Sequence, residues 1–225
     1  MSKKRRPRAP LQVSPEPVLQ ISKSERTRAA ILNAAFDFVW SHPFRDMTVQ
    51  SLMTETGMSR SAFYQYFGGR HELMEAMLDI LQQEIFVDTD PWFSGVGDPV
   101  ALLREALAGL VRVLHGRGPF MQAVADAAPS EGRLEKAWKR FLSRFDDAVS
   151  ARIEADQAQG LIQAFDPRPV AVALNRLDAH TLLEAFGRRP RSRPEPVREA
   201  LTRIWISTLY GVEWVVGESS RLVRT

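Results

Sequence analysis

The stretch that decides the fold is TVQSLMTETGMSRSAFYQYF, which occupies residues 48–67. Thr48 can cap a helix, because its hydroxyl accepts a hydrogen bond from a free backbone N–H of the first turn. Gly57 ends that helix, since glycine adopts the positive φ of a helix C-terminus without steric penalty. Ser59 then caps a second, shorter helix that we expect to run through Phe67. Two helices joined by a tight turn predict a helix-turn-helix unit.

Helices are also expected on both sides of this unit. From Lys23 to the residues before Pro43, apolar side chains recur at intervals of three and four, as on one face of an amphipathic helix. Beyond two adjacent glycines, the same pattern predicts a further helix from Arg70 to about Val87. We assign these elements to an N-terminal three-helix domain with a connecting helix, residues 23–87.

The remaining residues predict a larger helical domain. The run DTDPWFSGVGDP, residues 88–99, is rich in turn formers and predicts a junction, so we assign residues 88–225 to a C-terminal domain. Gly116, Gly118 and Pro119 are expected to end the first helix after the junction. Five helices are expected there, over residues 99–115, 120–128, 130–159, 167–187 and 196–217. With no alternation typical of strands, the sequence predicts an all-α chain of about nine helices.

Composition limits the possible functions. The chain has 225 residues, of which 44% are hydrophobic and 25% charged, as in ordinary globular proteins. It has no cysteine, which excludes a disulfide framework, a cysteine-rich zinc site and a thiol nucleophile. No stretch reaches the ~18 apolar residues of a membrane helix, and no apolar segment follows the N-terminal charges as in a signal peptide. We therefore expect a cytoplasmic protein with no membrane partner.

Positive charge gathers near the N-terminus. Residues 1–28 contain eight lysines or arginines and two acidic residues, a local charge of +6, whereas the whole chain has a net charge of +3. Residues 1–22 hold four prolines and are expected to form a disordered basic arm. Such an arm suits an anionic partner such as nucleic acid, and a solvated tail that only aids solubility is the alternative.

The second helix of the helix-turn-helix unit has an outward face that suits a DNA major groove. Arg60 can bond to guanine in a bidentate manner, Ser61 to either kind of base edge, and Ala62 can contact a thymine methyl. Tyr64 and Tyr66 can donate hydroxyl hydrogen bonds to phosphates. Any one of these residues alone is better explained as a solvated charge or a half-buried aromatic. The whole spaced set favours binding to double-stranded DNA.

From Glu25 to Met77, the pattern resembles the DNA-binding domain of the TetR family of transcriptional repressors, most clearly in ILNAAF and in residues 48–67. Arg70 stands where the family usually has lysine, and residues 41–47 lack a glycine often found there. The resemblance implies a repressor that a small-molecule effector releases from its operator, and the two-fold symmetry of a dimer makes that operator palindromic. The DNA-contacting residues that it implies are Thr48, Arg60, Ser61, Ala62, Tyr64, Tyr66 and Arg70.

Three stretches of the C-terminal half are similar to the ethionamide-regulator branch of that family: LEKAWKRFLSRF (134–145), ALNRLDAHTLLEAF (173–186) and IWISTLYG (204–211). This similarity implies a pocket for a small hydrophobic effector and a homodimer formed through the last two long helices. The implied ligand-binding residues are Leu103, Leu110, Trp138, Leu142, Phe145, Asn175, Asp178, Leu183 and Trp205. Trp138, Leu142 and Phe145 are spaced four and three apart and form an aromatic stripe on one face of the long helix. For a generic helical domain, the alternative is that this stripe is simply core.

Asp178 departs from that branch, which has an amide at this position. An amide can donate a hydrogen bond to a ligand carbonyl, whereas an ionised carboxylate only accepts. We therefore hypothesise that the pocket favours a ligand with a hydrogen-bond donor or a positive charge. The alternative is that Asp178 pairs with Arg176 or Arg203.

Other functions find less support in the sequence. Among the four histidines, only His180 has a partner, Glu184, at the spacing of a two-ligand metal site on one helix. The sequence has no phosphate-binding glycine loop, nucleophile elbow or paired-carboxylate motif, so we expect no enzyme, no cofactor and no metal. A non-specific or effector-independent DNA-binding protein is the remaining alternative. The arginines of residues 188–193 are expected in a stiff, solvated loop, with a second anionic contact as the alternative.

Overall fold

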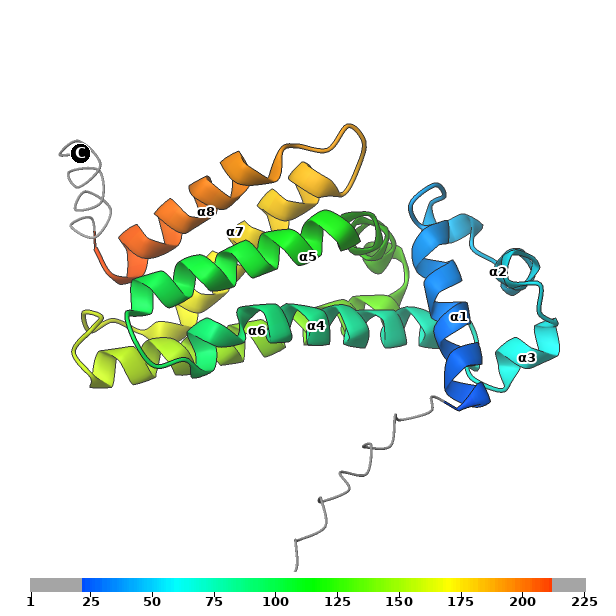
Figure 1. Cartoon of the computed structure of the whole chain (residues 1–225), viewed down its shortest axis with the longest axis horizontal. Helices are drawn as coiled ribbons and strands as arrows, with labels where there is room; N and C mark the ends of the chain where they lie inside the picture. Colours follow the sequence, from blue (N-terminus) through cyan, green and yellow to red (C-terminus); the bar gives the residue numbers. More distant parts are fainter. Residues whose placement is uncertain (1–21, 212–225) are drawn as a thin grey trace, which may run out of the picture.

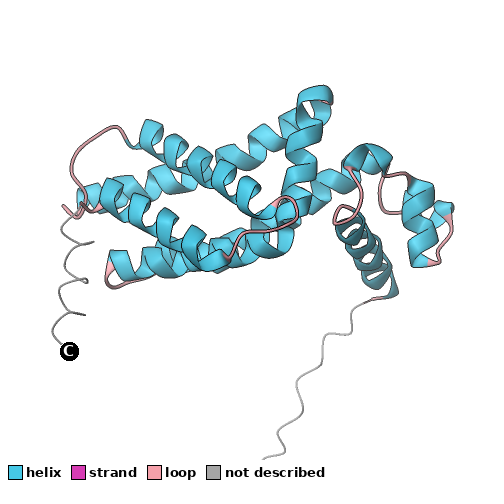
Figure 2. Ribbon diagram, turned by 90° about the horizontal axis from the view of Figure 1, so that it is seen from above, coloured by secondary structure: helices cyan, strands magenta, loops and turns pink. Residues whose placement is uncertain are grey.

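The computed structural model describes residues 22–211, so most of the expected basic arm and the end of the expected last helix lie outside the described residues. Within this range the chain forms eight α-helices and two short 3₁₀ turns, at Phe44–Asp46 and Ala128–Ser130. The helices are α1 Lys23–Phe38, α2 Val49–Thr56, α3 Arg60–Tyr64, α4 Arg70–Ser94, α5 Pro99–Ala127, α6 Gly132–Ala158, α7 Pro167–Phe186 and α8 Pro194–Leu209. Figure 2 shows only helices and loops among the described residues, which confirms the all-α prediction.

The local signals of the helix-turn-helix unit behave as expected. The Thr48 hydroxyl accepts a hydrogen bond from the Ser51 N–H at 3.0 Å, and the Ser51 side chain bonds back to the Thr48 N–H in a capping box. Gly57 has a φ of 66°, the left-handed conformation that glycine adopts most easily. Ser59 caps α3 by accepting from the Ala62 N–H. The second helix is shorter than expected, because the N–H groups of Tyr66 and Phe67 both bond to the Phe63 carbonyl in a turn.

Two expected helix breaks do not occur. The chain continues through Gly116, Gly118 and Pro119, so the expected helices 99–115 and 120–128 form the single helix α5. Gly118 serves close packing instead of a helix end: a Cβ there would lie 2.4 Å from the backbone carbonyl oxygen of Phe186. Pro119 is buried in the same contact region. Packing between α5 and α7 therefore outweighs the ~3 kcal/mol that a proline costs inside a helix.

The expected junction at residues 88–99 is also shorter than its composition predicts. Helix α4 continues to Ser94 with Pro91 inside it, and Thr89 and Trp92 on this extension are buried. The boundary that we drew after residue 87 thus falls inside α4. Only the residues between α4 and α5 remain outside a helix. The last helix also differs: α8 begins at Pro194, two residues before the expected start.

The described chain is elongated, with α1, α2 and α3 at one end and the bundle of α4 to α8 extending from them (Figure 1). One core cluster runs from the small end into the bundle, because it contains Phe63 of α3, Leu73 of α4 and Phe120 of α5. A second cluster surrounds Trp92 and Trp205 at the far end. Helix α4 connects the two ends, and its most extensive packing is against α5 and α6.

Candidate functional sites

Helix α3 presents a polar face and buries an aromatic one. Phe63 is fully buried, and its ring centroid lies 5.6 Å from that of Phe67, which is also buried. These two rings fasten α3 to the other helices. Arg60, Ser61 and Tyr64 point the other way and are exposed, with Tyr64 at 53% exposure. Because about half of its surface is exposed, the Tyr64 side chain is available to contact a binding partner.

The other predicted DNA-contacting residues are Ala62, which lies on α3 itself, and three residues outside α3. Thr48 is exposed at the start of α2, where it also caps the helix. Ala62 of α3 and Tyr66, two residues beyond its end, are half-buried and pack against the core. The set thus divides into four exposed residues, two half-buried residues beside them, and Arg70 on α4.

Arg70, at the first position of α4, already has partners within the chain. Its Nη2 lies 3.3 Å from Oε1 of Glu131, and its guanidinium lies 4.9 Å from the centroid of the Phe44 ring. His71 contacts the other oxygen of Glu131. Glu131 immediately precedes α6, so these contacts join the start of α4 to the start of the helix that crosses the bundle.

An apolar cavity of about 80 Å³ lies in the bundle between α4, α5, α6, α7 and α8. Seven of the nine residues implied as ligand-binding line it: Leu103, Leu110, Leu142, Phe145, Asn175, Asp178 and Trp205. Trp138 and Leu183 instead pack, half-buried, against the core outside the cavity lining. The adjacent positions on the inner face are taken by Phe141 and Leu182.

Sequence reasoning missed the contribution of α4 to this cavity. Ile85, Thr89, Trp92 and Phe93 line it from the second half of α4. The missed signal is the apolar spacing of Ile85, Thr89 and Trp92 at intervals of four and three, which continues the α4 stripe. The expected junction at residues 88–99 covers part of that stripe, because Pro91 and several turn formers stand within it.

Asp178 is the only titratable residue among those that line the cavity. It is 5% exposed, and its Oδ1 accepts a hydrogen bond from Nε1 of Trp205 at 2.9 Å. Burial raises the pKa of Asp178 to about 7, although the hydrogen bond from Trp205 acts in the opposite direction. The alternative pairing with Arg176 is wrong, because Arg176 is bound to Asp146 through both carboxylate oxygens. Arg203 has no ion pair with Asp178 either.

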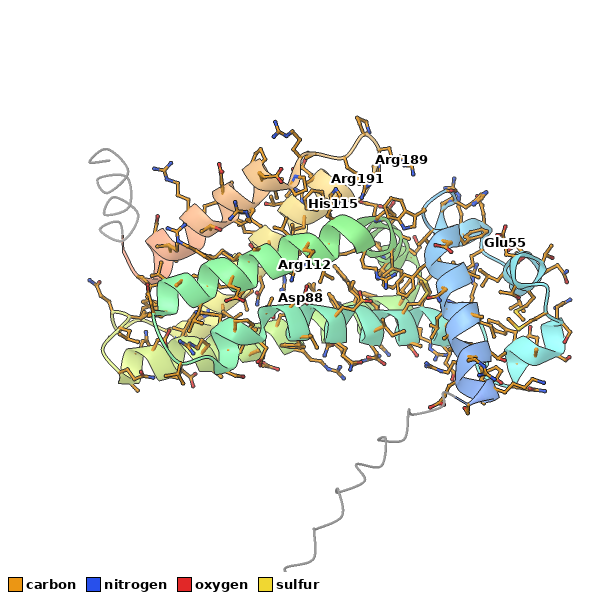
Figure 3. All side chains as sticks on the ribbon, in the orientation of Figure 1. Glu55, Asp88, Arg112, His115, Arg189 and Arg191 are labelled. Carbon is orange, nitrogen blue, oxygen red and sulfur yellow. The ribbon has the colours of Figure 1, made fainter. Side chains whose placement is uncertain are left out.

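The arginine-rich connection between α7 and α8 is not a freely solvated loop. Arg188 pairs with Asp126 of α5, and Arg191 donates a hydrogen bond to the backbone carbonyl of His115. The guanidinium of Arg191 also lies 4.7 Å from the ring centroid of Trp40, just beyond α1. Figure 3 shows Arg189, Arg191 and His115 together at the end of the bundle nearest α1. The connection therefore links the bundle to the helix-turn-helix end of the molecule.

Neither a metal centre nor a membrane helix is evident in residues 22–211. No group of three or more histidine, aspartate or glutamate side chains in this range could hold a metal ion. On the exposed surface of α7, Nε2 of His180 lies 3.9 Å from Oε2 of Glu184. None of the described helices is both long enough and apolar enough to span a lipid bilayer.

Comparisons with known proteins agree with this geometry. Residues 31–77 match the family "Bacterial regulatory proteins, tetR family", and residues 103–211 match "Transcriptional regulator EthR, C-terminal domain". The chain is 25% identical over 189 residues to the HTH-type transcriptional regulator EthR of Mycolicibacterium smegmatis, covering 81% of this chain and 86% of that protein. EthR of Mycobacterium tuberculosis is 25% identical over 186 residues, with the same coverage.

Solved structures show the same fold. A TetR-family regulator from Syntrophomonas wolfei superposes with a TM-score of 0.73 at 14% identity, covering 82% of this chain and 95% of that one. A second, from Rhodococcus, has a TM-score of 0.70 at 20% identity, covering 81% and 98%. The two family matches together span more than half of the sequence, on the two parts of the fold where the recognition helix and the cavity lie. The chain therefore belongs to the TetR family of bacterial transcriptional regulators, with a DNA-binding helix-turn-helix unit and a C-terminal half of the EthR type.

Proposed function

We propose that the protein is a homodimeric repressor that binds a palindromic operator through α3 and leaves it when a small apolar effector fills the cavity. The observation that carries this proposal is the pairing of two features in one chain. The short helix α3 presents an exposed polar face at one end, and an apolar cavity lies in the bundle. Helix α4 joins the two.

The DNA contacts divide by chemistry. Arg60, Ser61 and Ala62 at the start of α3 face the base edges, where a guanidinium, a hydroxyl and a methyl each distinguish bases. Tyr64 and Tyr66 bond to phosphates and orient α3 in the major groove. Thr48 and Arg70 add phosphate contacts at the starts of α2 and α4, where backbone N–H groups also favour an anion.

Helix α4 is suited to transmit effector binding. It has 25 residues, a length of about 37 Å. Arg70 stands at its start, while Trp92 and Phe93 line the cavity near its end. A ligand that binds more tightly when the second half of α4 moves outward also shifts the start of α4 and hence α3. Such a ligand prefers the conformation with α4 displaced over the conformation that binds DNA. The free energy of DNA binding weakens by the difference between the ligand's binding free energies for these two conformations, typically ~1–3 kcal/mol.

Dimerisation sets the spacing of the two recognition helices. A two-fold dimer places them in major grooves about 34–36 Å apart or at a multiple of that distance. A shift of α4 changes this distance in both protomers, so the two half-sites no longer match the protein. This mechanism requires a protein that has access to both DNA and small metabolites, which a cytoplasmic regulator has.

Fluorescence anisotropy on duplexes tiled from the DNA flanking the gene tests the proposal, with excess random competitor DNA at near-physiological salt. We expect one fragment to bind in a saturable, competitor-resistant manner, and Tyr64→Ala to abolish this binding. Val87→Ala, an exposed apolar residue on α4, is the control and should bind as the wild type does. Uniform, salt-sensitive binding to every fragment would instead favour the non-specific DNA-binding alternative.

A further inference from the structure

Three of the polar side chains that line the cavity have their hydrogen-bond donors occupied within the protein. The hydroxyl of Thr89 donates to the backbone carbonyl of Ile85 at 2.8 Å. The indole N–H of Trp92 donates to the hydroxyl of Tyr210 at 3.0 Å. The indole N–H of Trp205 donates to Asp178. None of these three N–H or O–H groups is left for a ligand.

Asn175 is oriented by a charged pair behind it. Its Nδ2 donates to Oδ1 of Asp146 at 2.9 Å, and Asp146 is held in turn by both terminal nitrogens of Arg176. Because an ionised carboxylate only accepts, the amide nitrogen of Asn175 faces Asp146 and the amide oxygen is the atom left over. Asn175 therefore offers its amide oxygen as an acceptor to the cavity that it lines, together with the one N–H of its amide group that Asp146 does not use.

Asp178 lies three residues further along the same helix and contributes a second acceptor. One of its oxygens is bonded to Trp205, and no lysine, arginine or histidine of residues 22–211 forms an ion pair with it. The other lining side chains are almost all apolar. A buried carboxyl without a cationic partner is costly in such surroundings unless it is protonated or meets a cation.

We propose that the effector is a slender apolar molecule with a protonated amine, and that this amine binds between Asp178 and the Asn175 amide oxygen. The inference rests on the proposed function and names the chemical class of its effector. An ammonium group has N–H donors on several sides and a positive charge, so it satisfies two acceptors one helical turn apart and neutralises the buried carboxylate. The hydrocarbon part fills the apolar remainder of the cavity.

A neutral ligand with a carbonyl group is the rival occupant. It requires a protonated Asp178 as donor, which is available in part near neutral pH because burial raises the pKa of this group to about 7. The two occupants respond to pH in opposite directions. Affinity for an amine rises with pH as Asp178 ionises, since an alkylamine stays protonated up to about pH 10. Affinity for a carbonyl compound falls over the same range. No other titratable side chain from α4, α5, α6, α7 or α8 lines the described cavity. The charged neighbours are the Asp146–Arg176 pair behind Asn175 and the Arg152–Asp156 pair behind Trp92.

Isothermal titration calorimetry of the full-length protein, without DNA, tests the inference with octylamine, octanol and octanoate as matched probes. At pH 8 we expect octylamine to bind at least tenfold more tightly than octanol, and octanoate to bind more weakly than either. Asp178→Asn has nearly the same volume and keeps an acceptor for Trp205, yet it should abolish the preference for the amine. Glu184→Gln removes an exposed carboxylate from the same helix and should leave the preference unchanged.

The wild-type protein supplies an independent measurement if the Asp178→Asn variant does not fold. The ratio of octylamine to octanol affinity should rise at least threefold from pH 6 to pH 8. A ratio that is flat or falls with pH, or a preference for the amine that survives in a folded Asp178→Asn variant, overturns the inference. These results are separate from the proposed function, which fails if no fragment is bound specifically or if no bound compound weakens binding to the operator.

Discussion

At the scale of single residues, Asp178 links the cavity to the stability of the fold. Burial raises its pKa from 3.8 to about 7, so the folded chain keeps a proton that the unfolded chain loses above about pH 4. The folded state binds more protons than the unfolded state between these two pH values. The contribution of Asp178 to the free energy of unfolding is therefore greatest at low pH and is lost as the pH rises to about 7.

We expect this loss to disappear in Asp178→Asn, because an amide does not titrate. Between pH 5 and pH 7 the wild type should lose up to ~1.4 kcal/mol of unfolding free energy per pH unit relative to the variant. Urea unfolding of both proteins at pH 5, 6, 7 and 8, without ligand, measures the difference. Glu184→Gln should follow the wild type. Parallel stability curves for wild type and Asp178→Asn would contradict the assignment of the raised pKa to this residue.

At the scale of helices, the contact between α5 and α7 explains why a glycine stands inside α5. A methyl group at Gly118 would meet the backbone of Phe186, whereas a methyl group at Gly116, two residues earlier on the same helix, would meet nothing within 4 Å. A substitution at Gly118 therefore tests the packing between α5 and α7, whereas a substitution at Gly116 tests helix propensity alone. Gly116 is exposed, so only helix propensity determines how a substitution there changes stability.

We expect opposite effects from alanine at these two positions. Gly118→Ala should destabilise the protein by ~1–3 kcal/mol, because the helices must separate to admit the methyl group. Gly116→Ala should stabilise it by up to ~1 kcal/mol, since alanine has the higher helix propensity. Thermal unfolding followed by circular dichroism measures both. If Gly118→Ala melted at or above the wild-type temperature, the close approach of α5 and α7 would not hold in solution.

The starts of α4 and α6 are joined through Glu131, which holds Arg70 and His71. Under the proposed function, Arg70 is needed at a DNA phosphate, so Glu131 competes with DNA for the same guanidinium. A movement of α6 at the cavity, which Leu142 and Phe145 line, changes this competition. The ion pair thus gives the effector a second route to the DNA-binding end, besides the displacement of α4.

Glu131→Gln should tighten DNA binding, because Arg70 no longer faces a competing carboxylate. We expect the plot of log affinity against log salt to steepen by ~0.9 for each protomer, the value for one further phosphate contact. Glu135→Gln is the matched control, since Glu135 pairs with Lys139 on the same helix and contacts no residue of α4 in an ion pair. Anisotropy at four salt concentrations measures the slopes. Equal slopes for the wild type and Glu131→Gln would show that Arg70 does not exchange partners.

At the scale of the whole molecule, α7 and α8 carry the surface proposed for dimerisation. On α8, Ala200, Ile204 and Thr208 are all exposed and recur every four residues, so they form one stripe with little charge. Ile204 is 38% exposed, one of the few large apolar side chains in the described chain that reach the surface. A stripe of this kind suits the helix of a second copy across a two-fold axis.

Ile204→Glu should therefore weaken the dimer, because two carboxylates would meet near the axis without a partner. Light scattering coupled to size-exclusion chromatography should give about twice the chain mass of 25.4 kDa for the wild type and a lower, concentration-dependent mass for the variant. Val87→Glu places the same charge at an exposed apolar position on α4 and should stay dimeric. A monomeric wild type would contradict the proposed dimer, and a variant as dimeric as the wild type would place the interface elsewhere.

The sequence by itself determined the helix-turn-helix unit. Its signals act over three or four residues: the Thr48 capping box, the left-handed Gly57 and the Ser59 cap. Such interactions form whatever the rest of the chain does, so the positions of α2 and α3 follow from residues 48–67 alone, apart from the last turn. The spacing on α6 likewise predicted that Leu142 and Phe145 line the cavity, whereas Trp138 of the same stripe lies outside the lining.

Only the tertiary structure decided where the long helices end and what encloses the cavity. Pro91 and Pro119 are helix breakers by local rules, but burial of Trp92 and the close contact at Gly118 carry α4 and α5 through them. The cavity takes its lining from five helices, and the arginine-rich connection meets Trp40 from a position far along the chain. Packing between distant segments sets these features, and its free energy exceeds the local preferences of one or two residues.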